Sequence, residues 1–222
     1  ILVGQRVEVT GREGIVPGVA GRKPIHLLEP AQRKKVVELK SMHIDIGAAD
    51  REEAESMVRV GDPVVIRTEP MQVAGSRLVS KSMDNRLGAF VALESTRRCA
   101  AGAGPGGSMA GVAAVQEEIG LFGARTSAFA LQPDLAVAVD VTHATDAPGV
   151  DEKEVGVHPL GSGPVIGRGS TLSPKVFELL VETAEAEGIE YSVSASGRST
   201  GTDADAIQIA RSGIPTGLVS IP

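Results

Sequence analysis

Two adjacent glutamates that directly follow a small apolar run constrain this chain more than any other feature. The run covers residues 109–115 and is typical of a buried strand, and Glu117 and Glu118 come just after it. Gly120 follows and predicts a turn into a helix. Ligands and chemistry gather at the carboxyl ends of strands in open α/β sheets, so we expect both carboxylates at such an edge. The alternative is an ordinary surface pair of glutamates.

The spacing of this pair limits how it can be used. Side chains of neighbouring residues on a regular strand point to opposite faces. Glu117 and Glu118 therefore converge on one site only if the strand has just ended, which Gly120 permits. One carboxylate can then hold a cation while the other accepts a proton.

Composition excludes several classes of protein. A hydrophobic content of 42% is enough for a core, and the net charge of −6 argues against a nucleic-acid surface. No apolar run reaches the roughly 18 residues that a membrane-spanning helix needs. Cys99 is the only cysteine, which excludes an internal disulfide and favours a reducing compartment. We expect a cytoplasmic protein with no nucleic-acid or membrane partner.

Residues 1–75 are expected to form a small all-β, barrel-like domain. Short alternating segments at 6–10, 42–46 and 63–66 predict strands, and glycines separate them. Residues 50–57 predict one short helix that begins after an aspartate cap. His26 and His43 are interpreted as structural or surface groups, because neither has a ligand-type residue three or four positions away.

Residues 76–222 are expected to form an α/β domain with a mixed, mostly parallel sheet and flanking helices. Helical patterns alternate with strand patterns, which is typical of layered α/β domains. The expected helices are 85–98, 124–131, 174–187 and 204–210, and the expected strands after the central run are 135–140, 189–195 and 215–221. The unbroken apolar run at 135–140 suits a parallel strand and ends in Asp140.

Two more carboxylates join the glutamates as candidate metal ligands. Asp84 lies just before the helix expected at 85–98, where it can also be a simple helix cap. Asp84, Glu118 and Asp140 are separated by 34 and 22 residues, about one βα unit each, so they can share one sheet edge. Oxygen ligands of this kind suit hydrolytic Zn, Mn or Co ions.

Four motifs occur in series along the chain. They are Asp-Asn-Arg-Leu-Gly at 84–88, Val-Gln-Glu-Glu-Ile-Gly-Leu-Phe-Gly-Ala at 115–124, Asp-Val-Thr at 140–142 and Gly-Thr-Asp-Ala at 201–204. Each motif is weak alone, but in this order and at these intervals they resemble, over nearly the whole chain, the M42 family of metallo-aminopeptidases, the glutamyl and deblocking aminopeptidase group.

The resemblance implies a zinc-peptidase-like fold with an inserted β domain associated with oligomer formation. It implies an aminopeptidase that removes N-terminal residues from peptides, works as a homo-oligomer and uses two divalent ions, with Zn favoured over Co or Mn. By position, Asp84 resembles the bridging ligand, while Glu118 and Asp140 resemble ligands to one ion each. Glu117 resembles the general base, and Asn85 is expected to orient Asp84.

The chain departs from the family pattern in its histidines. The resemblance places two histidine ligands outside this sequence, so the α/β domain is expected to be incomplete at both ends and inactive alone. His143 and His158 do not match the ligand positions, and residues 199–203 are expected to neighbour the substrate. Two alternatives remain: a catalytically dead assembly or binding module of the same fold, and a related metal-dependent deacylase.

Overall fold

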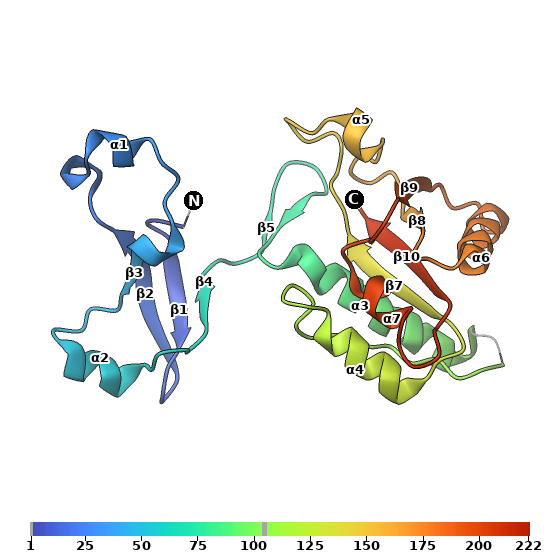
Figure 1. Cartoon of the computed structure of the whole chain (residues 1–222), viewed down its shortest axis with the longest axis horizontal. Helices are drawn as coiled ribbons and strands as arrows, with labels where there is room; N and C mark the ends of the chain where they lie inside the picture. The colour runs from blue at the N-terminus through green and yellow to red at the C-terminus, as the bar shows by residue number, and fades with distance from the viewer. Residues whose placement is uncertain (1, 104–105) are drawn as a thin grey trace. The chain divides into compact units, whose positions relative to one another are not determined.

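A four-stranded antiparallel sheet organises the N-terminal part of the chain. The computed structural model describes residues 2–103 and 106–222, which divide into two compact units, Ile1–Lys81 and Ser82–Pro222. In the first unit the strand order is β3-β2-β1-β4 (Figure 1). The strands are β1 (Arg6–Thr10), β2 (Ile15–Arg22), β3 (Met42–Asp45) and β4 (Val64–Ile66).

The pattern of β1 explains the core of this first unit. Val7 and Val9 alternate with polar residues and are each 5% exposed, as one face of a half-buried strand requires. The strands pair in an open row, and no pairing among the described residues closes the expected barrel. The unit also contains helices, so it is not all-β. Its remaining elements are α1 (Pro30–Arg33), α2 (Arg51–Met57), two short 3-10 turns (Ile25–Leu27, Leu39–Ser41) and the hairpin β5 (Met71–Gln72)–β6 (Leu78–Val79).

The predicted helix at 50–57 is confirmed as α2. The side chain of Asp50 caps it by accepting a hydrogen bond of 2.9 Å from the backbone N–H of Glu53. This bond satisfies one of the amide groups that the first turn of any helix leaves without a partner.

The second unit is an α/β domain around a mixed sheet. Its strand order is β7-β10-β8-β9, and two of the three pairings are parallel while β10 and β8 are antiparallel. The strands are β7 (Ala136–Val141), β8 (Val165–Gly169), β9 (Ser192–Ser196) and β10 (Thr216–Ile221). The helices are α3 (Met83–Arg98), which runs into a π-helical turn (Cys99–Ala103), α4 (Phe122–Leu131), α5 (Glu152–Val155), α6 (Pro174–Ala186) and α7 (Asp203–Ile207).

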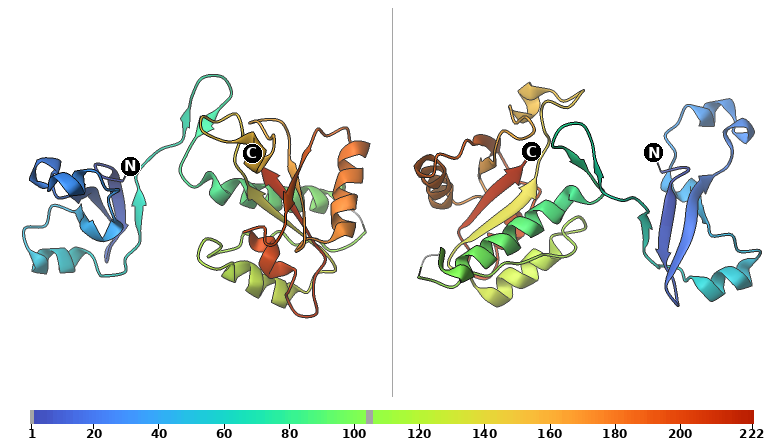
Figure 2. Two further views of the ribbon diagram at one scale, coloured as in Figure 1. Left: turned by 45° about the horizontal axis from the view of Figure 1, so that its top comes forward. Right: turned by 180° about the vertical axis from the view of Figure 1, so that it is seen from behind.

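Helices cover the sheet of this unit on both faces. Phe177 of α6 packs on Ile166 on one face. On the other face Ala204 of α7 is fully buried against Ala138 and Leu218. Figure 2 shows α7 beside α4, where Ala128, Ala210 and Ile214 form a further apolar cluster. None of the described helices is long and apolar enough to pass through a bilayer.

The strand predicted at 109–115 is wrong: within the described chain these residues belong to no strand. They are an extended segment whose Gly111 lies against α3, because a side chain there would strike Ala92 and Thr96. Met109 and Val115 are 49% and 65% exposed. The apolar character of the run therefore reflects contact with a helix and an open flank, with no ladder of hydrogen bonds to a neighbouring strand.

Candidate functional site

The paired glutamates lie in a tight turn that leads into α4. Backbone hydrogen bonds run to the Glu117 carbonyl from the N–H groups of Gly120 (3.1 Å) and Leu121 (3.0 Å). Gly120 has φ +144°, and a side chain there would meet the ring of Phe122. Position 120, where the sequence predicts a turn, thus requires glycine for two reasons: its backbone conformation and the close approach of Phe122. Glu117 is partly buried, whereas Glu118 is exposed.

Asp84 stands at the distorted start of α3. Its φ/ψ angles of −80° and 110° are not helical, and its carboxylate accepts no hydrogen bond from the described backbone, so it does not cap the helix. Asn85 follows and joins this end of α3 to β7, since its Nδ2 donates to the carbonyl of Val139 at 2.8 Å. Its Oδ1 accepts from the N–H of Gly88 at 2.8 Å.

Asp140 occupies the carboxyl-terminal part of β7, as predicted. Burial raises the pKa of its carboxyl group, and the nearby charges of Asp84 and Glu118 raise it further. One Asp140 oxygen accepts a hydrogen bond of 2.8 Å from the Val141 N–H, which opposes this effect.

The structure places Glu117 within electrostatic range of the three other predicted site residues. Burial is the largest cause that raises the pKa of Glu117 to about 7, and the charges of Asp140, Asp203, Glu118 and Asp84 add to it. Like charges held together disfavour ionisation of any one of them. A carboxyl group that titrates near neutral pH is suited to accept and release protons at that pH.

Asp203 is a fifth member of this group, for which the sequence predicts only a place in the segment 199–203 near the substrate. It begins α7 directly after the helix cap Thr202. Burial and the charge of Asp140 raise the pKa of Asp203, and its Oδ1 is shielded from solvent without a hydrogen-bond partner among the described residues. Its place in the Gly-Thr-Asp-Ala motif is the sequence signal that could have identified it.

Asp205, two residues further on, holds the loop before α7 in place. Its carboxylate accepts hydrogen bonds of 3.0 Å from the N–H of Thr200, 2.9 Å from the N–H of Gly201 and 3.0 Å from the hydroxyl of Thr171. Burial alone raises the pKa of this group, but these bonds outweigh burial and lower it.

The two downstream histidines stay outside the carboxylate group. His143 is exposed. His158 is 3% exposed, and its Nδ1 pairs with the hydroxyl of Ser192 at 2.7 Å. Across residues 2–103 and 106–222, no three His, Cys, Asp or Glu side chains stand close enough to hold a metal ion. The carboxylates thus share an electrostatic environment without forming a complete set of ligands.

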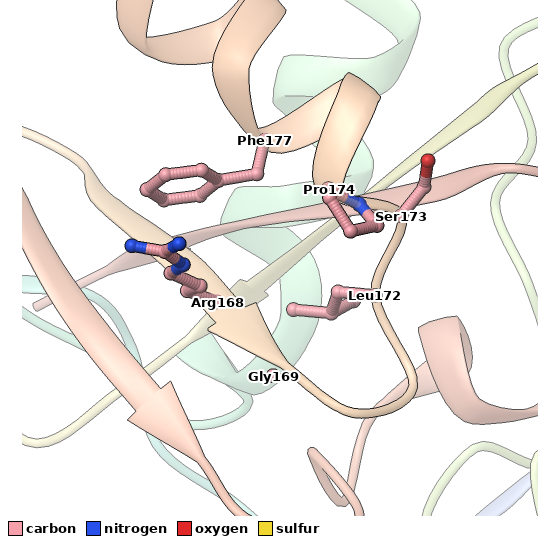
Figure 3. A pocket seen from close by; sticks show the side chains of 6 residues that line it. All are labelled: Arg168, Gly169, Leu172, Ser173, Pro174 and Phe177. Carbon is pink, nitrogen blue, oxygen red and sulfur yellow. The ribbon is translucent and has the colours of Figure 1, made fainter.

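Two hollows flank the sheet of this unit. The smaller one, about 100 Å³, is lined by Val141 and Thr202, the immediate neighbours of Asp140 and Asp203. The larger one, about 200 Å³, lies at the start of α6 (Figure 3). There the guanidinium of Arg168 stands 5.1 Å from the centre of the Phe177 ring, and no predicted site residue lines the hollow. The smaller hollow is therefore the one associated with the carboxylates.

Comparison with known proteins finds aminopeptidases and related peptidases that are similar to this chain. A lysyl aminopeptidase of Pyrococcus furiosus is 34% identical over 223 residues, which cover 100% of this chain and 63% of that protein. The crystal structure of a TET aminopeptidase from a marine sediment archaeon of the Thaumarchaeota matches with a TM-score of 0.90 and 38% identity, over 100% of this chain and 63% of that one. The TET1 peptidase of Pyrococcus horikoshii, which can assemble into a tetrahedron or a large octahedral shell, matches with a TM-score of 0.75 and 29% identity, over 100% of this chain and 64% of that one.

These similarities extend over the whole of the present sequence. The chain spans about 63% of the length of the relatives that it matches. The sequence model that describes the M42 glutamyl aminopeptidases matches residues 1–222. The chain therefore belongs to the M42 glutamyl aminopeptidase family of peptidases.

Proposed function

We propose that the protein containing this chain is a metal-dependent aminopeptidase that removes N-terminal residues from peptides. The observation that carries the proposal is the raised pKa of Glu117, about 7, within a group of four other carboxylates. Such a group is costly for a fold to maintain for stability alone, because its charges repel one another. Perturbed pKa values of this kind cluster at functional sites.

The donor chemistry of the group fits divalent cations. Asp84, Glu118 and Asp140 present anionic oxygen atoms, and no Lys or Arg is among the groups that shift the pKa of Asp140 or Glu117. We assign these three residues as ligands of two ions, with Asp84 shared between them and Zn favoured over Co or Mn. A two-ion site needs roughly four ligands per ion, so imidazole ligands from outside this chain would complete it.

Glu117 is proposed as the general base. Its pKa is raised to about 7, so it can take a proton from water and pass it to the departing amine near neutral pH. When bound, divalent ions lower the pKa of water and polarise the scissile carbonyl. The turn from Val115 to Gly123 holds Glu117 through the hydrogen bonds to its own carbonyl, which leaves its side chain free to move a proton.

A self-associating protein is the second part of the proposal. The match to a TET1 peptidase that forms closed shells supports assembly of several copies of this chain. Unit Ile1–Lys81 is proposed as the domain that mediates assembly, and unit Ser82–Pro222 as the catalytic domain.

A non-catalytic assembly module is the competing reading. The finding that favours it is that no three potential ligands in the described residues are close enough to hold an ion. The two are separated by elemental analysis of the purified full-length protein together with cleavage of aminoacyl-p-nitroanilides. Bound divalent metal with release of p-nitroaniline supports the enzyme. A folded protein that takes up no metal and cleaves no substrate supports the module.

A further inference from the structure

The hollow of about 100 Å³ next to the carboxylates has the position of a pocket for a substrate side chain. Its wall includes Ser220, which pairs across the parallel strands β10 and β7 with Asp140. Ser220 and Leu218 are two residues apart on β10, so both side chains point to the face that α7 covers. A residue placed there has its backbone close to Asp140 and Asp203.

The lining of this hollow carries hydroxyl groups that the protein does not use itself. Thr200 and Thr202 bond to each other at 2.9 Å, and both serve the loop before α7. Four other lining hydroxyls have no hydrogen-bond partner among the described residues, namely those of Thr142, Ser194, Ser196 and Ser220. Ser220 is only 8% exposed. Hydroxyl groups without a protein partner can exchange hydrogen bonds with a guest, so this wall is suited to a polar guest.

The size of the hollow limits that guest to a small side chain. A cavity of roughly 150 Å³ admits benzene, so the volume of about 100 Å³ suits a smaller group. The wall is tightly packed at Gly167, where a side chain would stand 3.0 Å from Cβ of Leu218. Val165, 1% exposed, closes the wall on β8 and leaves little room to expand.

The charge of the lining limits the guest further. None of the residues that line the hollow is ionisable. A glutamyl side chain inserted there would lose its hydration without gaining an opposite charge, which is strongly unfavourable. Small, uncharged and hydrogen-bonding side chains remain, and serine and threonine are the standard residues with that chemistry.

We propose that this hydroxyl-lined pocket receives the side chain of the substrate's N-terminal residue and selects threonine and serine. The proposal rests on the proposed aminopeptidase function. The pocket is formed by β7, β10, β8, β9 and the loop 200–202, and it determines the specificity for the N-terminal residue.

The test uses the full-length protein with its metal and a panel of aminoacyl-p-nitroanilides. Threonine and valine are the decisive pair, because they have nearly the same shape and differ in a hydroxyl. We expect kcat/KM for threonine to exceed that for valine at least tenfold, and leucine, lysine and glutamate to be poorer than both. A preference for valine over threonine, or for a large or charged residue, would overturn the proposal.

Variants connect this preference to the pocket. Ser220→Ala should bring the threonine-to-valine ratio toward one, because it removes a hydroxyl group that can bond the threonine side chain. Ser194→Ala is the second variant. Ser194 is less buried than Ser220, so this variant tests the pocket even if Ser220→Ala does not fold. Ser212→Ala, on the exposed turn after α7, is the matched control and should leave the ratio unchanged. An unchanged ratio in both pocket variants contradicts the assignment.

Failure of the underlying function gives a different result. If no substrate of any class is cleaved, the aminopeptidase proposal is wrong, and the pocket is then judged by calorimetry with threoninamide and valinamide. If threoninamide binds more tightly than valinamide and Ser220→Ala abolishes the difference, the pocket assignment is supported. If the two amides bind equally, the assignment is wrong.

Discussion

The side-chain amide of Asn85 donates a hydrogen bond of 2.8 Å to the backbone carbonyl of Val139. This bond joins the residue after Asp84 to the residue before Asp140, so it ties together the two parts of the chain that carry these carboxylates. Gly88 makes the contact possible, because any side chain there would collide with both Asn85 and the Val139 carbonyl. The predicted role of Asn85 in orienting Asp84 remains a proposal, to which this geometry gives a physical basis.

Replacing Asn85 by alanine should weaken metal binding in the full-length protein. Loss of a group that positions metal ligands commonly costs 10–100-fold in metal affinity or activity, and we expect a loss in that range. Asn85→Asp keeps an acceptor for Gly88 but sets a carboxylate oxygen against the Val139 carbonyl, so it should not restore binding. Metal titration followed by calorimetry measures the effect. Gln72→Ala in β5, which is exposed, is the control, and an Asn85→Ala protein equal to it would exclude the role.

Glu117→Gln should retain metal and lose most turnover. The amide has nearly the shape of the carboxyl group but cannot accept the proton, and general-base catalysis contributes about 10²–10⁴-fold. kcat on an aminoacyl-p-nitroanilide and the metal content of the same sample measure the two effects. Glu178→Gln, exposed on α6, is the matched control. Full turnover in Glu117→Gln would remove this residue from the base role.

Metal stoichiometry should distinguish Asp84 from Glu118. A shared ligand holds both ions, so Asp84→Ala should lose both together. Glu118→Ala should lose mainly one, because it is assigned to a single ion. Elemental analysis of the variants gives the number of ions per chain, and full occupancy in Asp84→Ala contradicts the bridging assignment.

The metal-free protein should become less stable as pH rises from about 4.5 to about 7. The pKa of Glu117 is raised from 4.5 to about 7 on folding, so in that interval the folded state binds more protons than the unfolded state. The stabilising proton is present at pH 4.5 and lost above pH 7. Urea unfolding at pH 5 and pH 8 measures the difference, which Glu117→Gln should reduce.

Divalent metal should reverse this trend at pH 8. An ion that binds the folded state stabilises it in proportion to the logarithm of its concentration over its dissociation constant. Addition of Zn or Co to the full-length protein at pH 8 should therefore raise the unfolding midpoint, and a midpoint that does not move would argue against a cation site among these carboxylates.

Asp205→Ala should loosen the loop that precedes α7. The carboxylate accepts hydrogen bonds from Thr200, Gly201 and Thr171, and bonds to a charged group contribute about 1.5–3 kcal/mol each. We expect a loss of about 2 kcal/mol or more in the free energy of unfolding and faster amide exchange at Thr200 and Gly201. Asp205→Asn retains part of the network and should lose less. Unchanged exchange in Asp205→Ala would contradict the bracing role.

Periodicity and capping residues were sufficient to predict most of the second unit. α6 follows from Ser173, Pro174 and an apolar stripe, and the Ser173 side chain accepts from the N–H of Val176 as a cap should. The strand after it begins at Ser192, three residues later than predicted. β10 is close to its predicted bounds because its apolar run is buried on both faces.

Features that depend on contacts between distant residues were not predicted. An apolar run has the same appearance whether it pairs in a sheet or lies along a helix, which is why 109–115 was assigned to a strand. The sequence does not predict β8, because Gly167 and Gly169 interrupt its apolar pattern. The folded chain requires both glycines, since Leu218 lies close to Gly167 and Ser196 lies close to Gly169. The sequence places Asp203 in the segment expected to neighbour the substrate but does not predict that it joins the carboxylates, since its burial and its proximity to Asp140 are properties of the folded chain.

The extended segment at 109–114 has a practical consequence for handling this polypeptide. Its amide and carbonyl groups form no hydrogen bond with another described residue, and apolar side chains such as Met109 and Val112 stand open to water beside them. A bare extended edge of this kind is a template on which a second molecule can add its own strand. Preparations of the 222-residue chain alone should therefore sediment as concentration-dependent aggregates, and a lysine at Val112 should keep them dispersed.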